Sequence, residues 1–289
     1  TRQLLSPLAL TFSVDRTDNP FEPRTGYRTQ FNLEHASSYT LSDFRYNRAA
    51  GDFAEFIPIA RHSVVAGHVR FGIVSALSST TEAVGLQSGT LDASSILHPR
   101  KRFYAGGSQS VRGYGEGQLG PRVLTISAAK LLANDASNPL CTAATIVKCN
   151  PNGAFKDRDF EPRPLGGNRL LEGSIEFRFP LFGPLTGATF VDGAYLAQNT
   201  SPGLPKSKTA VTPGFGVRYR SPVGPVRIDV GVNPTASEKL PVVTEDIANG
   251  GKGLVTLDAQ RLYSPTLQSG GINSVLARLT LHLSIGEAF

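Results

Sequence analysis

The sequence lacks any apolar run of about 18 or more residues, which argues against a helix that spans a membrane. It also lacks an initiator methionine and a visible signal peptide at Thr1, so we expect a mature or trimmed chain. Charged residues make up only 18%, and the net charge is +6. The arginines are scattered singly along alternating segments, as at Arg218 and Arg220. The sequence shows no basic patch with a recognition motif, and we therefore expect no nucleic-acid partner.

Cysteine is nearly absent as well. The chain has two, Cys141 and Cys149, with seven residues between them in a polar stretch. A local pair of this kind favours a loop disulfide formed in an oxidising compartment. A metal site would need further ligands, and none of the five histidines is close to the pair in sequence. We expect no metal and no cofactor.

Alternation of apolar and polar residues is the dominant pattern. In residues 275–286, Ala277 and every second residue up to Ile285 are apolar, and the residues between them are polar. About ten residues of such alternation cross a bilayer at a tilt. Eight further segments alternate similarly: 7–14, 26–36, 44–57, 63–75, 169–180, 187–198, 210–220 and 225–233.

The connections between these segments differ in length in a regular way. The short turns are 58–62, 182–186 and 221–224, and the long loops are about 76–168, 199–209 and 234–274. Outer-membrane barrels have short turns on one rim and long loops on the other. A secreted β sandwich is the alternative, since its strands also alternate, but it has no reason to place long loops at every second connection. The sequence therefore predicts an all-β, antiparallel transmembrane barrel.

The predicted number of strands is odd. Bacterial barrels usually have an even number, and a closed barrel has no unpaired edge. Either the alternation fails to reveal one further strand, or the nine segments are part of a larger barrel.

A glycine-rich stretch, residues 104–117, lies in the longest loop and carries five glycines around Arg112. So many glycines indicate a tightly folded loop, and we expect its arginine to pair with a carboxylate elsewhere. Asp192 and Glu176 are the candidates, because the alternation turns both side chains towards the lumen. The alternative is that these carboxylates belong to a general row of charged side chains in the lumen and have no specific arginine partner.

Val111-Arg112-Gly113-Tyr114 resembles the VRG[FY] signature of the BamA/TamA superfamily, which contains outer-membrane insertases and related translocators. Weaker resemblances follow the family's order along essentially the whole chain. They are Asp15 to Pro20 with Pro23 and Gly26, Gly173-x-x-Glu176, Phe190-x-Asp192, and Pro222 to Pro225 with Arg227-Ile-Asp229. One position departs: the family usually has glycine two residues after the aspartate, where this chain has Ala194.

The resemblance implies a sixteen-stranded barrel, of which residues 1–289 are the C-terminal part with the last nine strands. The first seven strands and the POTRA repeats would then be absent from this chain. The loop at about 76–168 would fold inward, with Arg112 paired to Asp192 and Glu176 at the same site. The Ser-Ile-Gly-Glu sequence near the end of the chain and the compact early loops resemble a TamA-like protein more than a BamA-like one.

The family's mechanism implies an assembly or translocation factor without enzymatic activity. Its first and last strands form a seam that opens laterally, and a client strand pairs with the exposed edge. Here the last strand is 275–286. Phe289 resembles an outer-membrane β-signal, and Gly286 is either a kink point or an ordinary strand end.

The implied location is the bacterial outer membrane, where we expect the lipid bilayer and unfolded outer-membrane or secreted polypeptides as partners. A periplasmic or inner-membrane assembly partner is a further expectation. Two alternatives remain: a two-partner-secretion polypeptide translocator, and a passive diffusion barrel. An enzyme is not expected, because the G-x-G-x-x-G match at Gly115 has no strand–helix unit around it, and Ser108 and Ser110 have no triad partners.

Overall fold

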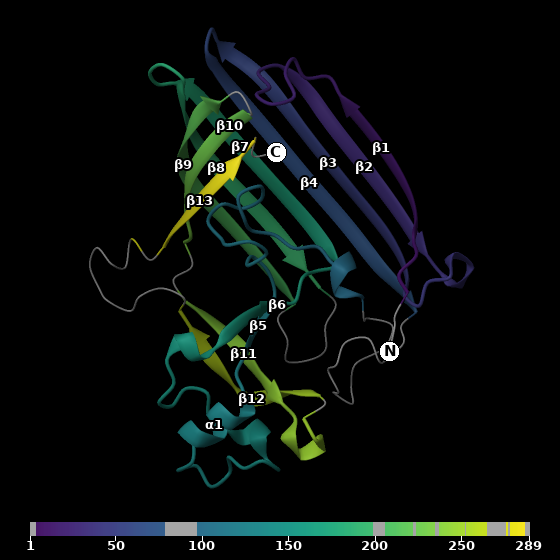
Figure 1. The fold of residues 1–289 in the computed structure, drawn as a ribbon, viewed down its shortest axis with the longest axis vertical. Coiled ribbons are helices and arrows are strands. Elements are labelled where there is room, and N and C mark those ends of the chain that lie inside the picture. The colour runs from purple at the N-terminus through teal and green to yellow at the C-terminus, as the bar shows by residue number, and fades with distance from the viewer. Residues whose placement is uncertain are drawn as a thin grey trace.

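The structure, a computed structural model, describes residues 4–78, 97–198, 206–221, 224–234, 237–251, 253–264, 276 and 278–286. Its main element is a nine-stranded antiparallel sheet in the order β1-β2-β3-β4-β7-β8-β9-β10-β13 (Figure 1). The strands are β1 (Leu8–Asp15), β2 (Gly26–Ala36), β3 (Arg45–Ala60), β4 (Ser63–Ser78), β7 (Arg169–Pro180), β8 (Leu185–Ala197), β9 (Ser207–Ser221), β10 (Gly224–Val232) and β13 (Leu279–Ile285). Each of the nine predicted segments overlaps one of these strands, with ends that differ by up to four residues, so the all-β, antiparallel prediction is confirmed.

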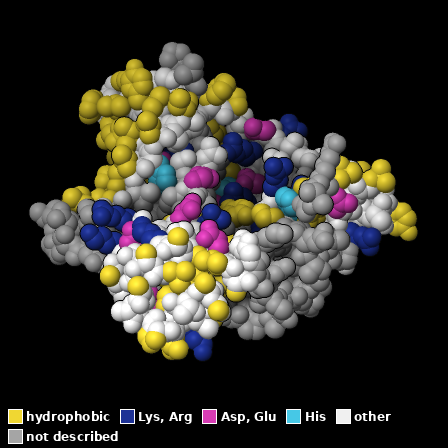
Figure 2. All heavy atoms as spheres, turned by 60° about the horizontal axis from the view of Figure 1, so that its bottom comes forward, with side chains coloured by type: hydrophobic (Ala, Val, Ile, Leu, Met, Phe, Trp, Pro, Cys, Tyr) yellow, Lys and Arg dark blue, Asp and Glu magenta, His cyan; other side chains and the backbone are white. Residues whose placement is uncertain are grey.

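The two faces of this sheet are chemically opposite. Large hydrophobic side chains such as Phe71, Ile175 and Phe215 are exposed on the outer face. Charged side chains such as Glu176, Arg178 and Arg218 are buried on the inner face. Figure 2 shows charges of both signs gathered in the hollow middle of the molecule, with hydrophobic side chains over the outer surface at its upper left. A soluble sandwich would bury the apolar face instead, so this polarity favours a sheet that faces lipid.

The sheet is open. It runs from β1 at one edge to β13 at the other, and the two edge strands do not pair with each other. Among the described residues, no helix is both long and apolar enough to cross a membrane.

A second sheet lies beyond the end of the first that carries the long connections (Figure 1). Its order is β12-β11-β5-β6, from β5 (Arg122–Thr125), β6 (Glu161–Pro164), β11 (Glu238–Glu245) and β12 (Leu254–Tyr263). Helix α1 (Ala128–Asn134) packs beside it. The 3₁₀ turns are η1 (Ser38–Thr40), η4 (Pro99–Lys101), η5 (Ile146–Lys148), η6 (Asp157–Asp159) and η7 (Ile247–Asn249).

The sequence predicts residues 76–168 and 234–274 to be loops without strands, but the second sheet is built from strands within both of these ranges. Strands β5 and β6 have four residues each, too few to show alternation, and β6 contains two prolines. Moreover, β5 pairs in parallel with β11, which lies more than a hundred residues later in the chain. Among the described residues of the predicted inward loop, 97–120 therefore lie against the large sheet, whereas 122–164 form β5, β6 and the segment between them, which belong to the outer sheet.

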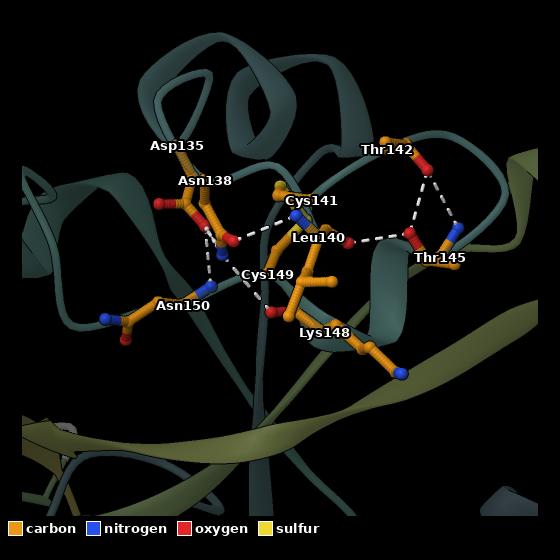
Figure 3. Close-up of a disulfide and its surroundings, with 9 residues drawn as sticks. All are labelled: Asp135, Asn138, Leu140, Cys141, Thr142, Thr145, Lys148, Cys149 and Asn150. Carbon is orange, nitrogen blue, oxygen red and sulfur yellow. Dashed lines mark hydrogen bonds between the residues drawn. A yellow bond between two sulfur atoms is a disulfide. The ribbon is translucent and has the colours of Figure 1, made fainter.

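The predicted disulfide is present between Cys141 and Cys149. Figure 3 shows it at the centre of a small loop, where Asn138 and Asp135 hydrogen-bond to the neighbouring backbone. Both cysteines are buried in the same hydrophobic cluster as Leu131 of α1. Asp135 lies near the two sulfur atoms. Because those atoms are bonded to each other, they offer no thiolate to a metal.

Candidate functional site: an arginine that joins loop and wall

The site begins with the pairing of β7 and β8. Ser174 lies directly opposite Asp192 in this ladder, and Glu176 is one inward position further along β7. Since side chains alternate across a strand, all three face the lumen side of the sheet. All three are buried, although none is apolar. Buried charges need partners, and the glycine-rich loop supplies one.

Arg112 reaches these residues from the loop. Its Nε and Nη2 donate to the two carboxylate oxygens of Asp192 at 2.8 Å each, which is a bidentate pair. Its backbone N–H donates to the same carboxylate at 3.0 Å. Nη1 donates to Glu176 at 2.6 Å, and the guanidinium carbon lies 3.3 Å from the centre of the Phe190 ring. Asp192 and Glu176 are thus not alternatives: Arg112 binds both.

Further charges surround this contact. Glu176 also accepts from Arg178 at 2.8 Å and from Arg218 at 2.5 Å. The Oδ2 atom of Asp229 lies 3.0 Å from Nη1 of Arg227 and 3.6 Å from Nη1 of Arg112. Four arginines therefore share three carboxylates in one buried cluster.

Burial alone would lower the pKa of the Arg112 guanidinium. The hydrogen bond to Asp192 and the charges of Glu176, Asp192 and Asp229 outweigh that effect and raise the pKa above its usual value. Arg112 is therefore held in its charged form. The cluster thus holds the loop and the wall together by charge.

The backbone of the loop makes this contact possible. Gly106 and Gly107 have positive φ angles of 99° and 116°, which side chains rarely tolerate. The N–H of Gly107 then donates to the carbonyl of Tyr114, which closes the loop on itself. Gly113 passes so close to Thr212 of β9 that a β-carbon there would collide with it. Val111 and Tyr114, which are also predicted motif residues, are buried in a hydrophobic cluster between the loop and the large sheet.

Some residues of the site were missed from sequence. Arg178, Arg218, Arg227 and Asp229 all have the inward parity of their strands, so the alternation alone would have grouped them with Glu176. Their convergence on the carboxylates around Arg112 was not visible in the sequence, because it depends on the register between strands. The departure at Ala194 is accommodated: this side chain is buried on the inward face of β8.

Of the two residues predicted to matter at the end of the last strand, Gly286 is described by the structure and Phe289 is not. Gly286 follows β13 with φ of 96°, and no atom lies within 4 Å of where its β-carbon would be. Phe289 lies outside the described residues, as do Pro222 and Val223 of the predicted turn.

Comparison with solved structures finds BamA from Haemophilus ducreyi lacking POTRA domains 1-3, with a TM-score of 0.52 and 16% identity. The match covers 78% of this chain and 38% of that chain, so the present sequence spans well under half of its relative. At this identity the likeness concerns the fold. Comparison with protein families matches the Omp85 superfamily domain over residues 1–245. The chain is therefore a protein of the bacterial outer membrane, and it belongs to the Omp85 superfamily.

Proposed function

We propose that residues 1–289 form the C-terminal part of the barrel of an outer-membrane assembly factor, which inserts or translocates polypeptides without enzymatic chemistry. The superfamily match supports insertion or translocation in general terms. The first seven strands and POTRA repeats would belong to the same protein outside this sequence. A TamA-like relationship stays a prediction.

The observation that carries this proposal is the buried contact of Arg112 with Asp192 and Glu176. A passive pore works with a fixed opening and does not require a loop that moves relative to its inner wall. A protein whose wall must change shape benefits from such a contact, because charged groups tolerate water when they separate. The contact is thus suited to a loop that docks and undocks.

The mechanism would use the edge of the sheet at β13. This strand has seven residues and pairs on one side with β10, whereas β3 and β4 have sixteen residues each. A short closing strand separates more easily than a long one. A client strand could then add to the exposed edge through backbone hydrogen bonds, with the lipid bilayer on the outer side. A periplasmic or inner-membrane partner would deliver the client.

The test uses the full-length protein in liposomes with an unfolded outer-membrane client. Arg112→Ala should reduce client assembly strongly, because the loop loses its attachment to β7 and β8. Arg220→Ala is the matched control: its Nε and Nη2 also grip a carboxylate, that of Glu22, at 2.6 and 2.7 Å. That arginine side chain is 61% exposed, however, so its loss should matter little.

The alternatives give different results in the same preparation. A two-partner-secretion translocator would move a soluble client across the membrane and fail to insert a barrel client. A passive diffusion barrel would conduct ions steadily, and Arg112→Ala would leave both conductance and liposome insertion unchanged. Normal client assembly by Arg112→Ala would contradict the proposal.

A further inference from the structure

The inward face of β13 carries three polar side chains at every second position: Thr280, His282 and Ser284. Two of them reach the tip of the glycine-rich loop. The Thr280 hydroxyl donates to the carbonyl of Gly113 at 3.0 Å, and His282 Nε2 lies 2.9 Å from the carbonyl oxygen of Arg112. Because a carbonyl only accepts, His282 Nε2 must carry the hydrogen in this contact.

The neighbouring strand is shaped for the same contact. Gly231 of β10 pairs with Thr280, and it has no side chain to keep the loop away. A β-carbon on Gly231 would collide with the backbone of Arg112 and Gly113. The loop tip therefore lies flat on the ladder between β10 and β13, with its backbone against the two strands.

Arg112 thus has two attachments on different parts of the sheet. Its side chain binds Asp192 of β8 and Glu176 of β7, whereas its carbonyl binds His282 of β13. Strands β9 and β10 lie between these two places in the sheet. One residue consequently bridges the inner wall and the closing strand.

A second contact outside the large sheet joins the loop to the connection between β10 and β13. The chain that leads from the loop tip forms β5, and the chain that leaves β10 forms β11; these two strands pair. Arg122 of β5 also donates to Glu238 of β11 at 3.0 Å. The loop is therefore held at its tip by β13 and, at the outer sheet, by the segment that follows β10.

From this geometry we infer that His282 and Thr280 are positioning residues that couple the loop to the seam. Strand β13 leaves β10 only when the loop tip is released, and undocking of Arg112 in turn loosens β13. The inference deepens the proposed function, since it states what controls opening of the seam. By reciprocity, each event shifts the other by the same factor.

Hydrogen exchange on the full-length protein tests this coupling without any client. In His282→Leu, amides of β13 and of residues 111–114 should exchange about three- to tenfold faster, as expected for the loss of one hydrogen bond. Thr280→Val should act in the same direction. His282→Gln, which can place an amide N–H near the Nε2 position, should restore slow exchange.

Ser284→Ala is the control, because this residue is on the same face of β13 and its hydroxyl has no hydrogen-bond partner among the described residues. The reverse direction uses Asp192→Asn, which should speed exchange in β13 although Asp192 does not contact that strand. The inference is overturned if His282→Leu behaves like Ser284→Ala, or if β13 loosens while residues 111–114 do not. A protein that fails to assemble clients but shows this coupled exchange would contradict the proposed function alone.

Discussion

Replacing Asp192 by asparagine should undock the loop while preserving the shape of the side chain. Among the described residues, the Asp192 carboxylate accepts four hydrogen bonds: three from Arg112 and one from the Ser174 hydroxyl. Asparagine has one acceptor oxygen in place of two. Its amide group would also point N–H donors at a guanidinium that has only donors. At least one of these contacts becomes repulsive.

The size of the effect follows from the charges. Four arginines already share three carboxylates, so the substitution leaves four cations against two anions in a buried cluster. Removing one partner of a buried ion pair costs about 3–5 kcal/mol. That corresponds to a decrease of about two to nearly four orders of magnitude in the docking equilibrium of the loop. Glu176 limits the loss, since it keeps its contact with Nη1 of Arg112.

The assay is hydrogen exchange of the loop amides in the full-length protein, combined with a double-mutant cycle. Arg112→Met alone strands Asp192, which then retains Ser174 as its remaining side-chain partner among those described. Combining Arg112→Met with Asp192→Asn removes both charges, and it should recover a large part of the protection, because replacing a whole buried pair is often neutral. If the two effects simply add, within about 0.5 kcal/mol, the pairing does not carry the docking and this reasoning is refuted.

Three further perturbations test other parts of the structure. Gly231→Ala should lift the loop tip from β10 and speed its proteolysis, whereas Gly67→Ala, which meets no atom within 4 Å, should not. Cys141→Ser should destabilise the outer sheet by about 2.5 kcal/mol, as expected for a short closed loop, and leave exchange in β7 and β8 unchanged. At the turn before β2, burial opposes ionisation of Asp18, but backbone N–H groups of the turn lower its pKa below the usual 3.8. Its stabilisation of that turn is complete above pH 3.8 and is lost as the pH falls through the lowered value, so turn amides of Asp18→Asn should lack this acid-dependent exchange.

The strands could be predicted because lipid and lumen impose opposite chemistry on alternate residues. Outward residues such as Ile175 and inward residues such as Glu176 therefore leave a period of two that needs no knowledge of the neighbouring strand. The outer sheet left no such signal. Strand β5 is four residues long, and its parallel partner β11 lies far away in the sequence, so the pairing is a product of tertiary structure.

The site was partly predictable for the same reason. Parity placed Asp192 and Glu176 inward, and the glycines around Arg112 indicated a loop that must approach something closely. The contribution of β13 was not predictable, because His282 contacts a backbone carbonyl and any residue at position 112 would present one. Contacts to the backbone leave no trace in side-chain chemistry, and only the register between β10 and β13 reveals them.

The use of charge in this site has a physical consequence for opening. An apolar loop tip would be held by burial, and its release would expose apolar surface to water in the lumen. A guanidinium and two carboxylates are instead rehydrated when they separate, which offsets much of the lost attraction. Arg112 is therefore held in one well-defined geometry by many hydrogen bonds, but the undocked state is not heavily penalised. Since the same residue also touches β13 through its carbonyl, a modest change in the docking equilibrium is enough to loosen the closing strand.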